Sequence, residues 1–179
     1  MELTKENVAV IAAIGLLIGT LITNAITFVI YLCKERSERL KRVRELNLEK
    51  GEELYRLILL HKETISIAHI NWVHVIDGNL TNDQLNEMTI EDATKNPERK
   101  NLAVKIELLA ALYFPFLSKK LKEAHKLLAE ANQVYFSLRK GVNNPQRSRN
   151  VVLDSSQLYS DKLEEILSDL ATEIRNKTM

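Results

Sequence analysis

The sequence predicts an all-α protein in which one N-terminal transmembrane helix continues into a cytosolic bundle of about four helices. Three observations predict this fold. The first is the uncharged apolar run Val8–Cys33, which is long enough to cross a bilayer as a helix. The second is the scarcity of glycine and proline, five and three in 179 residues, which leaves little material for the tight turns of sheets. The third is the helical spacing of apolar residues in the rest of the chain.

The transmembrane helix is predicted within residues 1–33. At 1.5 Å per residue, a helix over Val8–Cys33 spans about 39 Å, more than the roughly 30 Å of a hydrocarbon core. The run is too long for a signal peptide, and no small-residue cleavage site follows it. Lys5 is the only basic residue before the run, whereas many basic residues follow it closely. We therefore expect one pass, with the N-terminus outside and the C-terminal part in the cytoplasm.

One half of this helix carries lipid-compatible residues, and the other half carries small and polar ones. Gly15 and Gly19 form a GxxxG pair, which lets a second helix approach closely. Four polar side chains share this half with the glycines: Thr20, Thr23, Asn24 and Thr27. Hydrocarbon offers these groups no hydrogen-bond partner, so we expect the chain to self-associate in the membrane.

Two interpretations of the polar half stay open. In the first, the threonine and asparagine side chains bond across a tight helix pair, or to carbonyls of their own helix, and serve assembly alone. In the second, the glycines pack neighbour against neighbour in a ring while the polar side chains line a central opening. The run holds no charged residue, so such a pore would select weakly by charge.

A basic juxtamembrane helix is predicted over residues 34–50. It continues from the membrane helix, because no glycine or proline interrupts the sequence there. Glu35 and Arg39, and likewise Glu38 and Arg42, stand at the favourable spacing of four residues. The basic residues of this segment would contact anionic headgroups or line a vestibule beneath a pore. Because the whole chain has a net charge of only +1, we expect no stable nucleic-acid binding.

The cytosolic bundle is assigned to residues 51–179. Apolar residues at helical spacing predict a first core helix beyond Gly51, which the sequence Asp77-Gly78-Asn79 ends. Residues 80–95 are polar, and we interpret them as a connecting loop. Within this loop Thr81 and Gln84 have the spacing of a capping box, which indicates a short helical turn.

A second long helix is predicted to begin at Asn96-Pro97, with Asn96 as N-cap, and to run through Leu102–Leu138 until Gly141. Pro115 should kink it or divide it in two. The aromatic residues around Pro115 are expected to form a core wedge. A second loop is predicted over Val142–Val152, after which Asp154 or Ser155 caps a last amphipathic helix.

Metal, redox and cofactor chemistry find no ligand set in the sequence. Cys33 is the one cysteine, so no intrachain disulfide is possible. The four histidines show no metal-ligand spacing: His61, His69, His74 and His125. We expect no metal and no cofactor.

One pair of residues resembles a catalytic motif. Arg56 and His61, separated by four residues, have the spacing found in helical-bundle ribonucleases of the HEPN superfamily, whose sites form across a dimer. On one straight helix the two side chains lie about 140° apart, so they could share a phosphate only through distortion or across an interface. The alternative is a structural role for both residues.

The layout as a whole resembles the small membrane accessory proteins of type VI-B CRISPR systems: a membrane helix, a basic rod and a small helical domain with a divergent HEPN-like Arg56/His61 pair. That family works beside an RNA-guided, RNA-cleaving CRISPR nuclease and strengthens anti-phage defence. The resemblance implies a homo-oligomeric ring of perhaps eight copies in the bacterial inner membrane. Its pore would disturb the membrane potential once the partner nuclease has found its target.

The sequence departs from active HEPN nucleases at two points. Leu57 follows the arginine where a polar residue often stands, and the pair lies in the first cytosolic helix rather than later. We therefore expect a nonenzymatic pore-forming effector that depolarises the membrane. The first alternative is a membrane-tethered HEPN-type ribonuclease that uses Arg56 and His61. A second alternative is an anchor that recruits the nuclease to the membrane.

Overall fold

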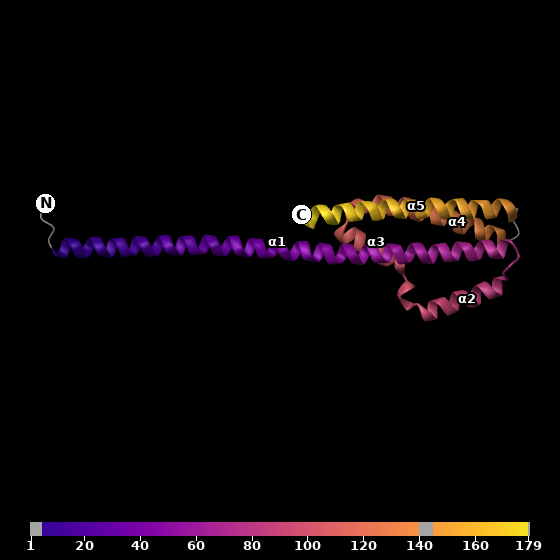
Figure 1. Cartoon of the computed structure of the whole chain (residues 1–179), viewed down its shortest axis with the longest axis horizontal. Coiled ribbons are helices and arrows are strands. Elements are labelled where there is room, and N and C mark those ends of the chain that lie inside the picture. Colours follow the sequence, from indigo (N-terminus) through magenta and orange to yellow (C-terminus); the bar gives the residue numbers. More distant parts are fainter. Residues whose placement is uncertain (1–4, 140–144, 179) are drawn as a thin grey trace. The chain divides into compact units, whose positions relative to one another are not determined.

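The computed structural model describes residues 5–139 and 145–178, and every regular element within these ranges is a helix (Figure 1). The prediction of an all-helical chain is confirmed for these residues. The likeness to HEPN domains and the grouping as a four-helix bundle stay predictions. The chain divides into two compact units between Leu46 and Asn47, within the segment 34–50 that the sequence sets apart.

Helix α1 covers Lys5–Ile76, 72 residues that include both the apolar run and the first core helix. It ends where the sequence predicts. Gly78 adopts a left-handed conformation with φ of 78°, which glycine accepts without a Cβ clash. The N–H of Asn79 donates to the carbonyl of His74 at 2.9 Å, and that of Gly78 donates to Val75 at 3.2 Å. This pair of bonds is a Schellman ending, which satisfies carbonyls left open by the last turn.

The loop predicted over residues 80–95 is wrong, because Asn82–Lys95 form helix α2. The capping box is present: the backbone N–H of Gln84 donates to the Thr81 hydroxyl at 3.2 Å, and the Thr81 N–H donates to the Gln84 side chain at 2.9 Å. No helix breaker follows before Asn96, so the helix continues beyond its first turn. Leu85 is buried and fixes α2 to the rest of the unit.

Asn96 is an N-cap with Pro97 in the first helical position, as predicted, but the long helix expected to continue from there is wrong. Pro97–Arg99 form a single 3-10 turn, η1, and helix α3 covers Leu102–Tyr113. Asn101 interrupts the two with a left-handed backbone, φ 59°. Asparagine tolerates that conformation better than most residues do.

Pro115 divides the long apolar stretch as predicted. Helix α3 ends at Tyr113, Pro115–Leu117 form the 3-10 turn η2, and helix α4 covers Ser118–Arg139. The predicted end at Gly141 lies outside the described residues.

The last helix, α5, covers Pro145–Thr178 and begins well before the predicted caps Asp154 and Ser155. The loop expected over Val142–Val152 is therefore wrong from residue 145 onward; residues 142–144 lie outside the described ranges. Tertiary contacts account for the difference. Ser148 and Val152 are buried. The Arg149 Nε lies 3.1 Å from a carboxylate oxygen of Asp77, which holds this first part of α5 against the end of α1.

The core of the second unit draws buried side chains from α1, α3, α4 and α5. Phe114 is fully buried at the break after α3, as expected of a core wedge, whereas Phe116 is largely exposed. Trp72 of α1 stacks on Tyr135 of α4, with ring centroids 4.4 Å apart and planes 4° from parallel. The buried cluster consists of Leu54, Leu57, Ile58, Leu102, Ile106, Ala110, Phe114, Leu117, Leu121, Ala124, Tyr159, Leu163, Ile166, Leu167 and Leu170.

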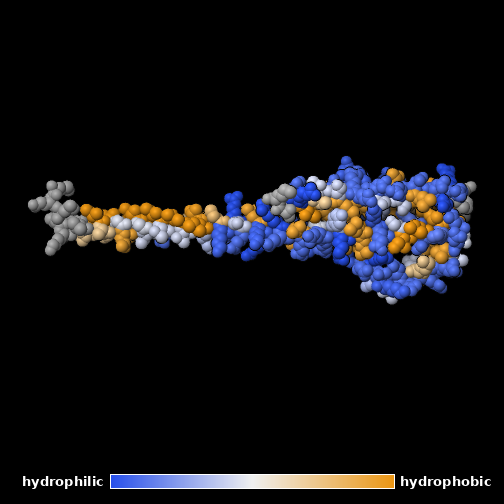
Figure 2. Space-filling view, viewed as in Figure 1, coloured by the Kyte–Doolittle hydropathy of each residue, from blue (hydrophilic) through white to orange (hydrophobic). Residues whose placement is uncertain are grey.

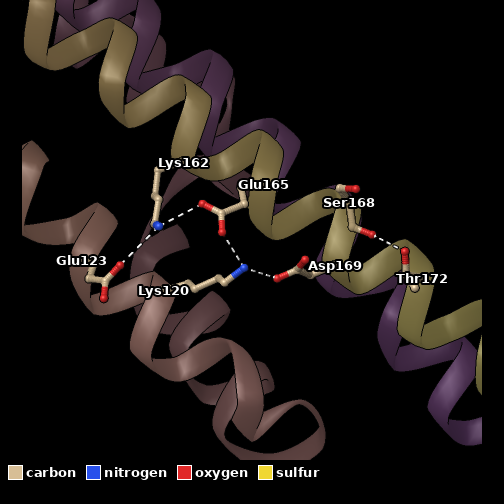
Figure 3. Close-up of polar contacts among 7 residues, drawn as sticks. All are labelled: Lys120, Glu123, Lys162, Glu165, Ser168, Asp169 and Thr172. Carbon is tan, nitrogen blue, oxygen red and sulfur yellow. Dashed lines mark hydrogen bonds and ion pairs between the residues drawn. The ribbon is translucent and has the colours of Figure 1, made fainter.

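Helices α4 and α5 are joined by a chain of ion pairs (Figure 3). Lys120 contacts Glu165 and Asp169, both at 2.5 Å. Lys162 contacts the same Glu165 at 2.9 Å and Glu123 at 3.2 Å. Hydrogen bonds from Lys120 and Lys162 hold the pKa of Glu165 down at about 2. The network aligns the two helices above the apolar core.

The Ile174 side chain of α5 lies directly against Gly51 of α1. A Cβ at this position would lie 2.6 Å from the Ile174 Cδ1 and 3.4 Å from the Phe114 ring. The missing side chain of Gly51 makes room for the end of the Ile174 side chain, which would have to shift if a Cβ were added.

Candidate functional site

The first candidate site is the apolar segment of α1, defined as residues 9–33. Every side chain from Ala9 to Leu46 is exposed. The most apolar stretch of 18 residues in this helix has a mean hydropathy of 2.2, and none of that stretch is buried. It is the one helix in the described ranges that is long and apolar enough to cross a membrane. Figure 2 shows a hydrophobic edge and a paler edge along it. A core helix of this hydropathy would be covered by other helices, and this segment is not.

The three threonines of the segment satisfy their own hydroxyl donors. Thr20 donates to the Leu17 carbonyl at 2.9 Å, Thr23 to Gly19 at 2.9 Å and Thr27 to Thr23 at 2.8 Å. Such bonds to the preceding turn let threonine sit in an apolar helix without a partner chain. The sequence left two kinds of partner open for the threonines, a neighbouring helix or carbonyls of their own helix. In the structure all three use carbonyls of their own helix.

Asn24 differs from the threonines. Its side-chain amide makes no hydrogen bond to any residue in the part of the chain that the structure describes. An amide has two N–H donors and a carbonyl acceptor, and all of them are left for an outside partner. By its position, Asn24 lies about 5 Å along the helix from the middle of the apolar run.

Gly15 and Gly19 also have no explanation within the chain. A Cβ built at either position meets nothing within 4 Å. Neither glycine has the positive φ that would require a missing side chain, as Gly78 has. The space that the two glycines leave is thus available to another molecule.

The second candidate site, the Arg56/His61 pair, is not assembled in the structure. Arg56 is exposed, whereas His61 is buried and its Nε2 has no hydrogen-bond partner and no contact with solvent. Burial, with the nearby charge of His125 adding to it, lowers the pKa of His61 to about 4. His61 is neutral near pH 7 and turned into the core, so its free ring nitrogen cannot reach a phosphate from this position.

No family model, curated protein or solved structure matches the chain.

Sequence reasoning missed the polar groups that surround His61 in the core. Its ring meets His125 and Tyr159 edge to face, with centroids 6.4 Å and 6.1 Å away. His125 Nδ1 lies 2.8 Å from a carboxylate oxygen of Glu107. The Tyr159 hydroxyl is buried without a partner, and burial raises its pKa. Only the tertiary fold brings these groups together, and no spacing in the sequence indicates it.

His69 is a second buried histidine of α1. Both of its ring nitrogens are buried without partners, its ring lies 4.9 Å from that of Trp72, and burial lowers its pKa to about 4. Among the described residues, no group of three or more His, Cys, Asp or Glu side chains is placed to hold a metal ion. His61 and His69 therefore behave as neutral core residues.

Proposed function

We propose that this protein is a membrane effector whose α1 helices assemble into a ring and open an ion-conducting pore that depolarises the membrane. The observation that carries the proposal is the unpaired amide of Asn24 in a helix otherwise suited to lipid. Leaving such an amide in hydrocarbon without a partner costs about 2–7 kcal/mol. Water in a channel, or another copy of the helix, removes that cost.

Helix geometry favours a ring over a pair. At 100° per residue, Asn24 lies about 160° around the helix from the midpoint of Gly15 and Gly19. One contact between two helices cannot bury both sets of residues. In a ring each helix has two neighbours and an inner face, so the glycines can receive one neighbour while Asn24 borders the opening.

The orientation and trigger complete the proposal. Basic residues follow the apolar segment and are nearly absent before it, which favours a cytoplasmic location for the second unit in a bacterial inner membrane. The resemblance of layout to type VI-B CRISPR accessory proteins suggests the trigger, namely an RNA-guided nuclease that has found its target. A ring of about eight copies follows from the same resemblance.

The test measures membrane potential with a voltage-sensitive dye in bacteria that express the full chain, a type VI-B nuclease and a matching target RNA. The deciding variant is Asn24→Leu. Its matched control is the double variant Asn24→Leu with Ile22→Asn, which keeps the amide and the overall hydropathy but moves the amide about 160° around the helix. Fractionation establishes that each protein reaches the membrane.

We expect depolarisation with the natural chain only, and only with the target present. Both variants should reach the membrane and conduct nothing, because the amide must border the opening. Equal depolarisation by all three proteins would show that Asn24 does not border the ion path. No depolarisation by any of them, with defence intact, would remove the pore proposal.

The ribonuclease alternative has its own test. Arg56→Ala with His61→Ala must abolish RNA cleavage by the purified protein if these residues are catalytic. The burial of His61 favours the opposite result, in which the natural chain cleaves no RNA. An anchor that only recruits the nuclease would bind it directly and leave the membrane potential unchanged.

A further inference from the structure

Helix α3 is apolar on its outer face as well as on its inner face. Its inner face is buried in the core through Leu102, Ile106 and Ala110. A surface helix normally presents charged residues on the other side, as α4 and α5 do with the ion pairs of Figure 3. Helix α3 has only two charged residues among its 12, Lys105 and Glu107. Its outer face therefore offers solvent little that is polar.

Four large apolar side chains at intervals of four residues are exposed here, and we name them the α3 stripe: Val104, Leu108, Leu112 and Phe116. The first three are spaced by four residues along α3, and Phe116 follows in η2. Between 46% and 65% of each residue is exposed. Single exposed leucines are ordinary on protein surfaces, but an aligned set of large apolar residues indicates a contact site.

A hollow of about 250 Å³ lies beside the stripe, between α3 and α4. It is lined by Glu107 and Ala111 of α3 and by Ser118, Leu121 and Lys122 of α4. An apolar strip beside a small pocket is the arrangement in which a partner's side chain can serve as an anchor. The surface thus has both a flat part and a recess.

The size of the stripe limits what can occupy it. Four such residues expose on the order of 400 Å² of apolar surface, about half of the ~800 Å² per partner that a stable free-standing complex buries. This contact alone is too small to hold two freely diffusing proteins together. It suits a partner that is already held nearby by another attachment, because tethering raises the effective concentration to the millimolar range.

The charges beside the stripe argue against a lipid surface as its occupant. Helices that lie on membranes carry a basic polar face, which anionic headgroups attract. Helix α3 instead has one charge of each sign, and Glu107 is paired with His125 at 2.8 Å. Counted with Lys122, which lines the hollow, these charges sum to only +1, which is far from the basic face by which helices bind anionic membranes.

We propose that the α3 stripe packs against a second copy of this chain within the membrane assembly. The inference rests on the proposed function, since assembly through α1 provides the tether. It adds a contact in the second unit, which the membrane helices alone do not require. The contact fixes neighbouring copies at a second point and so restricts their rotation in the ring.

The test uses the full chain in lipid vesicles, with the photo-crosslinking residue p-benzoylphenylalanine at position 108 or 112. The matched control places it at position 90, because Ile90 of α2 is 67% exposed and outside the stripe. Cys33, the exposed single cysteine at the end of the apolar segment, reports membrane assembly separately through disulfide formation between copies. Mass spectrometry identifies what each probe captures.

We expect positions 108 and 112 to give adducts of twice the 20.5 kDa chain mass, and position 90 to give none. Leu108→Glu should reduce the position-112 adduct about tenfold, because a charge enters an apolar contact. Near-UV circular dichroism checks that this variant is folded.

Two results would overturn the inference while the proposed pore stands: disulfides through Cys33 without chain-to-chain adducts at 108 and 112, or lipid adducts at those positions. Equal adducts at position 90 would also overturn it, because the contact would not be specific to the stripe. If neither Cys33 nor the stripe links copies, the ring itself is excluded and the inference falls with it.

Discussion

Gly15 and Gly51 lie in the same helix, α1, but their surroundings differ. A Cβ at Gly51 would press against Ile174, whereas a Cβ at Gly15 meets nothing within 4 Å. The same contrast holds along the two parts of the helix: residues 9–46 are all exposed, and the part from Asn47 contributes Leu54, Leu57 and Ile58 to the core. Contacts within the chain account for the second part. The first part carries features that only an outside partner explains.

The largest expected effect is on the free energy of unfolding, and it distinguishes the buried Phe114 from the exposed Phe28. Phe114→Ala should lower the free energy of unfolding of the second unit by about 3–5 kcal/mol, because it opens a cavity at a fully buried site. Phe28→Ala, in the exposed apolar segment, should leave this unfolding unchanged. Near-UV circular dichroism of the stacked Trp72 and Tyr135 follows the transition in detergent. Equal losses in both variants would contradict the division of α1 into two environments.

The next effect is a dependence on pH that belongs to the second unit alone. Burial lowers the pKa of His61 and His69 from 6.5 to about 4, so the unfolded chain binds more protons between these values. Stability should therefore fall as the pH drops, by about 2 kcal/mol for each histidine between pH 7 and pH 5.

Melting temperatures across this pH range check the prediction. His69→Leu should remove about half of the dependence, because one of the two titrating groups is gone. The apolar segment contains no histidine, so retention of the chain in the membrane at pH 5 should not change. A melting temperature that stays flat from pH 7 to pH 5 would show that the two histidines are not buried as neutral groups.

The glycines give an intermediate effect. Gly51→Leu should destabilise the second unit by about 1–3 kcal/mol, because Ile174 occupies the space that the new side chain needs. Gly15→Leu should not affect that unit but should reduce disulfide formation between copies through Cys33, since it fills the space offered to a neighbouring helix. If Gly15→Leu assembled as well as the natural chain, the GxxxG pair would have no part in assembly.

The smallest effect concerns the ion pairs between α4 and α5. Glu165→Gln removes the carboxylate shared by Lys120 and Lys162, and it should lower the melting temperature slightly at low salt. The difference from the natural chain should disappear in 1 M salt, at which the screening length is about 3 Å. A difference that persisted at high salt would indicate that Glu165 contributes through packing.

The sequence predicts those parts of the fold whose signals are local. The end of α1 follows from Gly78, the start of α2 from Thr81 and Gln84, and the division after α3 from Pro115. The start of α5 does not follow from the sequence, because the burial of Ser148 and the pairing of Arg149 with Asp77 depend on residues far away in the chain.

The candidate sites show the same limit. The spacing of five residues already indicates that Arg56 and His61 face different directions, and the structure has the first exposed and the second buried. The polar half of the apolar segment is readable from sequence, but the difference between its residues is not. The threonines bond to carbonyls of their own helix and Asn24 does not, a distinction that only the three-dimensional structure reveals.

The most direct test of the central claim is the reactivity of a single cysteine within the apolar segment. Thr20→Cys and Ile22→Cys, each with Cys33→Ser and with Asn24 kept, are treated with a water-soluble, membrane-impermeant thiol reagent in membranes from bacteria that hold the type VI-B nuclease and its target RNA. Thr20 lies about 40° around the helix from Asn24, so if this side borders a water-filled opening, its cysteine should react about tenfold faster or more, because thiols react as thiolates and these form only in a polar environment. Equally slow reaction at both positions, with Cys33 of the natural chain reacting readily, would contradict the pore.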